Sequence, residues 1–309
     1  MSLRSTSRRK SARAGQDRNS LIGQSVITPY LFSAPAIAVV SLILAFPVLY
    51  ALYGSLLRQH ALEVGTPFLG LGNYRAIFAD PAFWSALGRS LVFLIGVLVL
   101  GTILSLLFGY ALMAAVGRLR FLRTMSLMPY IVSGVATAVM FRLFFDREFG
   151  MPNKLIEFIG MEGWGWLVNP KLAMLTVILA QLWGDLPLCM LLILGGLQSI
   201  DSEYLDAALV DGASGWKRVR YISLPLIAPQ IALSTVLLTY GGVTAFAVVL
   251  ALTGGGPGTA TELVGIHMYF KAFQELDMGQ AMAIVIALLT VNCLLVAFFA
   301  RLGRSRNAE

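Results

Sequence analysis

Few side chains in this sequence have both the type and the position to do chemistry inside an apolar segment. Asp185, in Trp183-Gly184-Asp185-Leu186-Pro187, is the only carboxylate well inside one of the long apolar runs. An ionisable group in such a run faces protein or water and marks a pathway for ions or substrate. Asp185 is therefore the first candidate for a substrate pathway. The alternative is that it pairs with Arg142 or caps a helix break at Pro187.

Several polar and aromatic residues of the same apolar runs could hydrogen-bond to a solute or stack on it. These candidate pathway residues are Gln181, Trp183, Asp185, Tyr240, Phe246 and Asn292. Aromatic side chains in such positions also pack helices together, so that interpretation stays open for Trp183, Tyr240 and Phe246. The pair Gly241-Gly242 allows either close helix contact or a helix break at which substrate binds.

The residues needed for ATP binding or enzyme catalysis are missing from the sequence. The phosphate-binding pattern G-x-x-x-x-G-K-[ST] requires a Gly-Lys pair, and this chain has none. His60 and His267 lie far apart and are expected to be solvated loop residues. Cys189 and Cys293 have no cysteine or histidine at metal-ligand spacing and are expected to be small core residues. We therefore predict no catalytic residue and no metal site in this chain.

The composition places this chain in a membrane. Of its 309 residues, 58% are hydrophobic and 13% are charged, whereas a typical soluble domain has about 25% charged residues. A membrane-spanning helix needs about 20 mainly apolar residues, and six runs supply them. This predicts an all-α bundle of six transmembrane helices. The expected spans are Thr28–Leu57, Ser90–Val116, Phe121–Phe145, Lys171–Leu197, Ile227–Leu252 and Gly279–Ala300.

Clusters of Lys and Arg predict the orientation of these spans. They lie in the tail of residues 1–27, in the loop Gly117–Arg123, in the loop of residues 199–225 and after the sixth span. Basic residues are retained on the cytoplasmic side, so both termini are expected to be cytoplasmic. The net charge of +7 therefore reflects topology, and we expect no nucleic-acid partner. The tail is polar and basic and is expected to be disordered, while residues 28–309 form the transmembrane domain.

The long cytoplasmic loop, residues 199–225, has the pattern of an amphipathic helix. Asp201 or Ser202 can cap this helix. Four residues at helical spacing form its apolar face: Leu205, Ala208, Leu209 and Gly212. Gly212 suits a turn into a second short helix, which Ser214 can cap. The small residues keep the face low, so that another protein surface can approach closely, although such a helix could also lie on lipid.

The same loop resembles the EAA loop of the permease subunits of ABC importers. The family pattern is E-A-A-x-x-x-G-x(9)-I-x-L-P, and Asp206 replaces its glutamate by a carboxylate one methylene shorter. In the family this loop forms coupling helices that sit in a cleft of the ATPase subunit. The resemblance therefore implies an ATPase-coupling loop with these residues: Asp206, Ala207, Ala208, Asp211, Gly212, Leu224 and Pro225.

The resemblance covers the chain from about Pro29 to Arg301. The segments 68–74 and 80–84 look like the family's first outer loop, and Met128-Pro129-Tyr130 resembles the start of its core domain. The stretch from Thr253 to Glu262 resembles the T-G-G-P-x-x-x-T-E segment of maltose- and glycerol-phosphate-type permeases. This implies a carbohydrate, a polyol or a sugar derivative as substrate, and the sequence does not choose among them.

The resemblance also implies a complex in a bacterial or archaeal inner membrane. Its partners would be a second homologous permease subunit, an ATPase dimer that holds ATP and Mg, and an extracytoplasmic solute-binding protein. This chain would form half of the translocation pathway and hold no cofactor of its own. The competing class is an ion-coupled secondary transporter that uses Asp185. Such a transporter has no need of an ATPase-docking loop, so the loop favours the ABC importer.

Overall fold

The computed structural model describes residues 27–114 and 120–306 of the chain. The described residues form helices joined by loops and turns, and β pairing among them is limited to two isolated bridges, Leu57 with Phe68 and His60 with Asp277. This confirms the predicted all-α class. The chain divides into two units, Met1–Tyr53 and Gly54–Glu309, which are considered separately below. The predicted disordered tail, residues 1–27, lies outside the described residues except for Ile27.

The described part of the first unit, residues 27–53, lies entirely within helix α2, Ile27–Ser55. It matches the first predicted span and continues through Pro35 and Pro47. Large apolar side chains are exposed along it, such as Phe32 (82% exposed) and Leu42 (70%). A helix that is apolar on all sides requires an apolar surrounding, which lipid provides.

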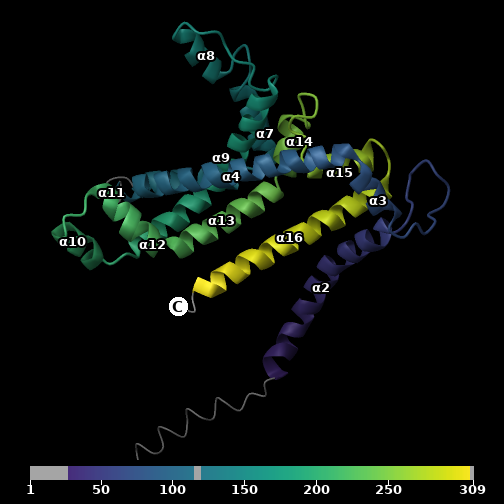
Figure 1. Ribbon diagram of the computed structural model, residues 1–309, viewed down its shortest axis with the longest axis horizontal. Coiled ribbons are helices and arrows are strands. Elements are labelled where there is room, and N and C mark those ends of the chain that lie inside the picture. The colour runs from purple at the N-terminus through teal and green to yellow at the C-terminus, as the bar shows by residue number, and fades with distance from the viewer. Residues whose placement is uncertain (1–26, 115–119, 307–309) are drawn as a thin grey trace, which may run out of the picture. The chain divides into compact units, whose positions relative to one another are not determined.

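Three long helices of the second unit lie side by side: α4 (Pro81–Ala114), α9 (Pro170–Gln198) and α13 (Ala228–Val243) (Figure 1). Small residues of α4 permit this close approach. A Cβ atom on Gly101 would lie 2.8 Å from side-chain atoms of Leu182 and Leu238, and one on Gly109 would lie 2.7 Å from Ile193. Glycine at helix contacts is characteristic of membrane bundles, in which packing replaces the hydrophobic effect between helices.

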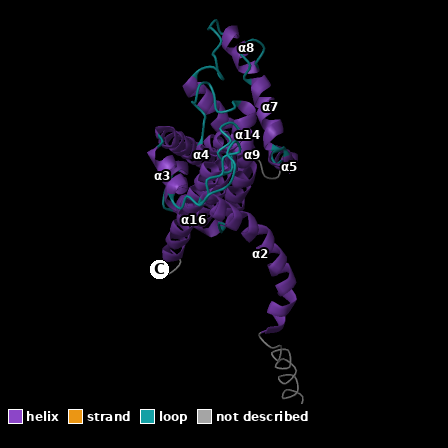
Figure 2. Cartoon of the chain, turned by 90° about the vertical axis from the view of Figure 1, so that its right-hand side faces the viewer, coloured by secondary structure: helices purple, strands orange, loops and turns teal. Residues whose placement is uncertain are grey.

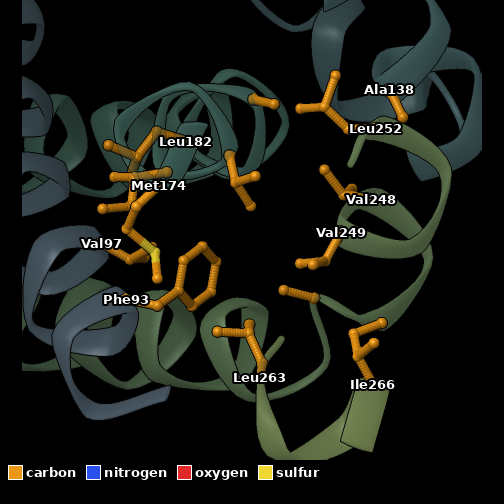
Figure 3. Packing of buried hydrophobic residues seen from close by; sticks show 14 of the residues in the cluster. Phe93, Val97, Ala138, Met174, Leu182, Val248, Val249, Leu252, Leu263 and Ile266 are labelled. Atoms are coloured by element: carbon orange, nitrogen blue, oxygen red, sulfur yellow. The ribbon is translucent and has the colours of Figure 1, made fainter. Parts of the chain in front are cut away.

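The main apolar core joins these helices to shorter ones. Phe93 and Val97 of α4 face Leu182 of α9 in this core (Figure 3). The remaining labelled side chains come largely from α7 (Gly134–Phe144), α14 (Phe246–Leu252) and α15 (Val264–Phe273). Val97 and Val249 are fully buried, and this core includes Leu182, next to the predicted pathway residues Gln181 and Trp183.

Two of the predicted spans are broken rather than continuous. The third consists of α5 (Arg120–Met125), α6 (Met128–Ile131) and α7. Pro129 lies in the first turn of α6, where its missing backbone N–H removes no helical hydrogen bond. The side chain of Ser133 caps α7 by accepting a hydrogen bond from the Ala136 amide. The fifth span divides between α13 and α14 at Thr244.

The number of six spans stays a prediction that the described residues are compatible with. Three described helices are long and apolar enough to cross a membrane alone: Phe32–Ser55, Pro81–Ala114 and Pro170–Gln198. The pair Gly215–Leu226 and Ala228–Val243, bent by 72°, would form a fourth. The other two predicted spans coincide with α5–α7 and with α16 (Met278–Arg306).

A second, smaller core ties α3 (Gly72–Ala79) to α16 and α4. Ile77 of α3 is buried there against residues of the other two helices. Asn73 is also buried, and its amide donates hydrogen bonds of 2.8 Å each to the carbonyl oxygens of Ser55 and Leu57. The asparagine of the segment 68–74 therefore has a structural role, because it ties the start of α3 to the backbone of Ser55 and Leu57.

Candidate functional site

The polar centre of the bundle lies where α9 packs against α13. The Gln181 side-chain amide donates a hydrogen bond of 2.9 Å to Oδ2 of Asp185, one helical turn further along α9. The Asp185 carboxylate lies directly against the backbone of Gly241, where a Cβ atom would be 2.7 Å from its Cγ. Gln181 is 9% exposed, and within the described residues its Oε1 atom has no hydrogen-bond partner. This pair thus places a carboxylate and one unbonded acceptor, Oε1 of Gln181, between α9 and α13.

The alternatives for Asp185 find no support in these contacts. Among the described residues no ion pair joins Asp185 to Arg142, which is exposed on α7. Helix α9 also continues through Pro187 without interruption, so Asp185 does not cap a break. Its role in a substrate pathway stays a prediction.

Gly241 and Gly242 are both buried within α13 and do not break it. Gly241 makes room for Asp185, and a Cβ atom on Gly242 would lie 2.9 Å from Leu94 of α4. The break instead follows at Thr244, whose hydroxyl donates to the carbonyl of Tyr240. The glycine pair therefore serves close helix contact, and the expectation of a helix break at this pair was wrong.

The other candidate pathway residues are not gathered around Asp185. Phe246 and Asn292 line one mostly apolar pocket, together with Ser90 and residues of α4, α15 and α16. Trp183 packs edge-on against Phe141, with ring centroids 6.2 Å apart. Tyr240 is 69% exposed on α13. The structure thus brings together Gln181 with Asp185, and Phe246 with Asn292.

The predicted ATPase-coupling loop forms the two short helices that the sequence implied. Helix α10 (Ser202–Val210) begins after Asp201, whose side chain accepts a hydrogen bond from the Glu203 amide. Gly212 follows with a φ of +73°, a conformation that glycine adopts without strain. Helix α11 (Gly215–Arg218) follows Ser214, whose side chain makes no capping bond. The π-helical turn η1 (Val219–Ser223) and α12 (Leu224–Leu226) lead into α13.

The two alanines of α10 lie on different sides of the helix. Ala208 is 5% exposed, so the chain itself covers it, whereas Ala207 is exposed. Glu203, Asp206 and Val210 are also exposed, and Val210 reaches 89%. Together with Ala207 they follow the spacing i, i+3, i+4 and i+7 and therefore share one face of the helix. A direct contact between Ala208 and another protein would require the loop to open, so the face of α10 that is open to contact is the one that carries Ala207.

The stretch from Thr253 to Glu262 is a compact loop held by its own polar groups. The hydroxyls of Thr253 and Thr261 lie 2.7 Å apart, and the Thr261 hydroxyl donates to the Gly256 carbonyl at 2.8 Å. Gly255 has a φ of +89°, which favours glycine at this position. The threonines and glycines of the segment therefore set the path of the chain between α14 and α15.

Glu262 at the end of this loop joins a buried polar cluster that the sequence did not predict. Its carboxylate lies 2.8 Å from Nδ1 of His267, and its backbone carbonyl accepts a hydrogen bond of 3.0 Å from Arg89 of α4. His267 is 5% exposed, so the expectation of a solvated histidine was wrong. No helical spacing marked this pair, because Glu262 precedes the N-cap residue of α15 and His267 lies five residues further on, in the first turn of the helix.

Lys271 extends this cluster along α15. Its ammonium group lies 3.5 Å from the Asp80 carboxylate and 2.7 Å from that of Glu275. Burial lowers the pKa of Lys271, but the hydrogen bond to Glu275 and the negative charges outweigh this, and the pKa lies above its usual value. Lys271 therefore stays charged and holds α15 to the residue that precedes α4.

Comparisons with known proteins point to a single group of membrane transporters. Residues 101–307 match the family model described as "Binding-protein-dependent transport system inner membrane component". A probable ABC transporter permease protein of Pyrococcus horikoshii is 32% identical over 87% of this chain and 93% of its own length. The sn-glycerol-3-phosphate transport system permease protein UgpA of Agrobacterium fabrum is 31% identical, over 93% and 98% of the two chains.

One further relative and one solved structure are also similar to this chain. The trehalose/maltose transport system permease protein MalF of Thermococcus litoralis is 30% identical over 90% of this chain and 94% of its own. A chain in the crystal structure of a bacterial alginate ABC transporter, solved with an alginate pentasaccharide-bound periplasmic protein, superimposes with a TM-score of 0.77. The match covers 94% of this chain and 96% of the other at 20% sequence identity. At this level of identity the similarity shows the fold alone.

Proposed function

This chain belongs to the family of binding-protein-dependent transport system inner membrane components, and we propose that it is the permease subunit of an ABC importer for a carbohydrate or a related polyol or sugar derivative. The relatives named for glycerol phosphate and for trehalose and maltose support this substrate class. The single observation that carries the proposal is the ordered loop from Asp201 to Pro225, which has the EAA spacing and presents an exposed helical face.

The partners follow from the same premise. ATP and Mg would be held by a separate ATPase dimer that docks on this loop, and a second permease subunit would complete the pathway. A solute-binding protein would deliver the substrate on the outer side. An ion-coupled secondary transporter using Asp185 has less support, because the family is defined by its dependence on a binding protein.

Energy coupling tests this proposal. The isolated chain is expected to show neither ATPase activity nor stoichiometric nucleotide binding, because it lacks a phosphate-binding loop. The complex purified through this chain is expected to hydrolyse ATP, faster when its binding protein carries a sugar. Nucleotide titration of the isolated chain and ATPase assays with loaded and empty binding protein measure both effects. Stoichiometric nucleotide binding by the isolated chain would contradict the proposal.

The orientation of the chain is a separate prediction. Cysteines introduced by Arg8→Cys and Arg304→Cys should resist an impermeant thiol reagent in intact cells, because basic residues are retained in the cytoplasm. A cysteine introduced by Lys154→Cys should react. Each variant is made in a Cys293→Ser background, since Cys293 is exposed and Cys189 is buried. Reaction at both terminal sites in intact cells, with Lys154→Cys protected, would reverse the topology.

A further inference from the structure

The segment of residues 146–169 forms an arm that carries helix α8, Met151–Phe158. In both views α8 lies beyond the end of α7, away from α4 (Figures 1 and 2). One fully buried side chain, Asn153, holds the arm together. Its amide donates to the carbonyls of Arg147 (3.0 Å) and Trp164 (2.9 Å), and its Oδ1 accepts from the Trp164 amide and the Trp166 indole (2.9 Å each).

The face of α8 opposite Asn153 is apolar and unusually exposed. Four residues at positions i, i+4, i+7 and i+8 share this face. They are Met151 (60% exposed), Leu155 (60%), Phe158 (87%) and Ile159 (67%). The two charged residues of the helix, Lys154 and Glu157, pair with each other at 3.0 Å. The arm thus presents an apolar surface that carries no charged side chain.

The surface that leads to α8 indicates what covers this face. Exposed apolar side chains continue along α7, which belongs to the third predicted span: Val135, Val139, Met140, Leu143 and Phe144. Because the family is an inner-membrane family, the natural surrounding of that surface is lipid. Trp164, 43% exposed beside Asn153, is a residue type enriched where a chain leaves the hydrocarbon. An amphipathic helix at this place matches the pattern of one lying in the membrane surface.

We propose that α8 lies in the outer lipid–water boundary of the membrane, with Met151, Leu155, Phe158 and Ile159 buried among the lipid chains. Asn153 fixes the orientation of the helix, and the Lys154–Glu157 pair stays in water. The arm thereby anchors the outer end of α7, which packs against α14 and α9. This inference rests on the family and on the predicted orientation, and it does not depend on the substrate.

Fluorescence quenching in lipid nanodiscs tests the proposal on the complex purified through this chain. An environment-sensitive dye is attached to a single cysteine, from Phe158→Cys or from the matched control Glu157→Cys, in the Cys293→Ser background. The dye at position 158 is expected to shift its emission to the blue and to be quenched by phospholipids with a nitroxide on the acyl chain. Its iodide quenching constant should be several-fold below that of the dye at position 157.

Two results would overturn the proposal. Equal iodide quenching at both positions would place the apolar face in water. Protection of position 158 from both iodide and the nitroxide lipids would show that a protein covers it. Repeating the measurement with and without the binding protein then shows whether the covering protein is the binding protein or a second permease subunit. Because residue 158 is so exposed, its replacement is expected to leave the folding of the arm intact, and unchanged ATPase activity verifies that the complex is still assembled.

Discussion

Replacing Asp185 by asparagine is expected to reduce uptake by about tenfold or more while leaving the complex assembled. The amide has the size of the carboxylate, so the packing against Gly241 is retained and only the charge is lost. A hydrogen bond to a charged group contributes about 1.5–3 kcal/mol, and about 1.4 kcal/mol corresponds to a factor of ten. Initial uptake rates over a range of substrate concentrations, with the yield of purified complex, measure the effect.

Variants of two glycines separate the charge of Asp185 from its position. Gly241→Ala should also impair uptake, because its Cβ atom would lie 2.7 Å from the Asp185 Cγ and displace the carboxylate. Gly184→Ala is the matched control, since a Cβ atom there meets nothing within 4 Å. Normal uptake by Asp185→Asn together with poor assembly of Gly241→Ala would show that Asp185 only fills the contact between α9 and α13.

The long helices could be predicted from the sequence because an uninterrupted apolar run of sufficient length has one stable form in lipid. The breaks could not be placed in the same way. Gly241-Gly242 had the composition of a break, yet the chain breaks at Thr244, because the glycines are needed where α13 meets Asp185 and Leu94. The choice between contact and break depends on neighbours that are distant in sequence.

The burial of polar residues could not be predicted from the sequence either. His267 lies in a short segment of mixed composition, and only its proximity to Glu262 and Asp80 makes a buried imidazole favourable. Asn153 gives no signal at all, since its bonds reach residues up to 13 positions away. Helical periodicity did identify the face of α10 that carries Ala208, but it could not tell whether a partner or the chain itself covers that face.

Replacing Gly212 by valine is expected to abolish most transport without removing the protein from the membrane. Gly212 has a φ of +73°, and a β-branched residue there is strained, at a cost of about 1–3 kcal/mol. The turn between α10 and α11 would rearrange, while the apolar spans that determine insertion would be unchanged. Uptake assays and the amount of chain in the membrane fraction measure the two effects, and Gly215→Val, at a glycine without positive φ, is the control.

Tryptophan at each of the two alanines of α10 distinguishes docking from folding of the loop. Ala207→Trp is expected to leave the loop folded, because Ala207 is exposed, but to prevent α10 from seating in a groove of the ATPase. The result should be loss of transport with either a detached ATPase or hydrolysis that no longer depends on substrate. Ala208→Trp should instead destabilise the loop, since overpacking a buried site costs about 1–3 kcal/mol, and limited proteolysis within residues 199–225 would detect this.

The conservative change Ala207→Ser should preserve transport, because it keeps the exposed face low. Co-purification of the ATPase and substrate-stimulated hydrolysis are compared across the three variants. If Ala207→Trp retains the ATPase and supports uptake at the wild-type rate, this face of α10 does not dock on the ATPase. The amphipathic pattern of the loop would then be better explained by contact with lipid, and the energy source of this transporter would have to be sought at another surface.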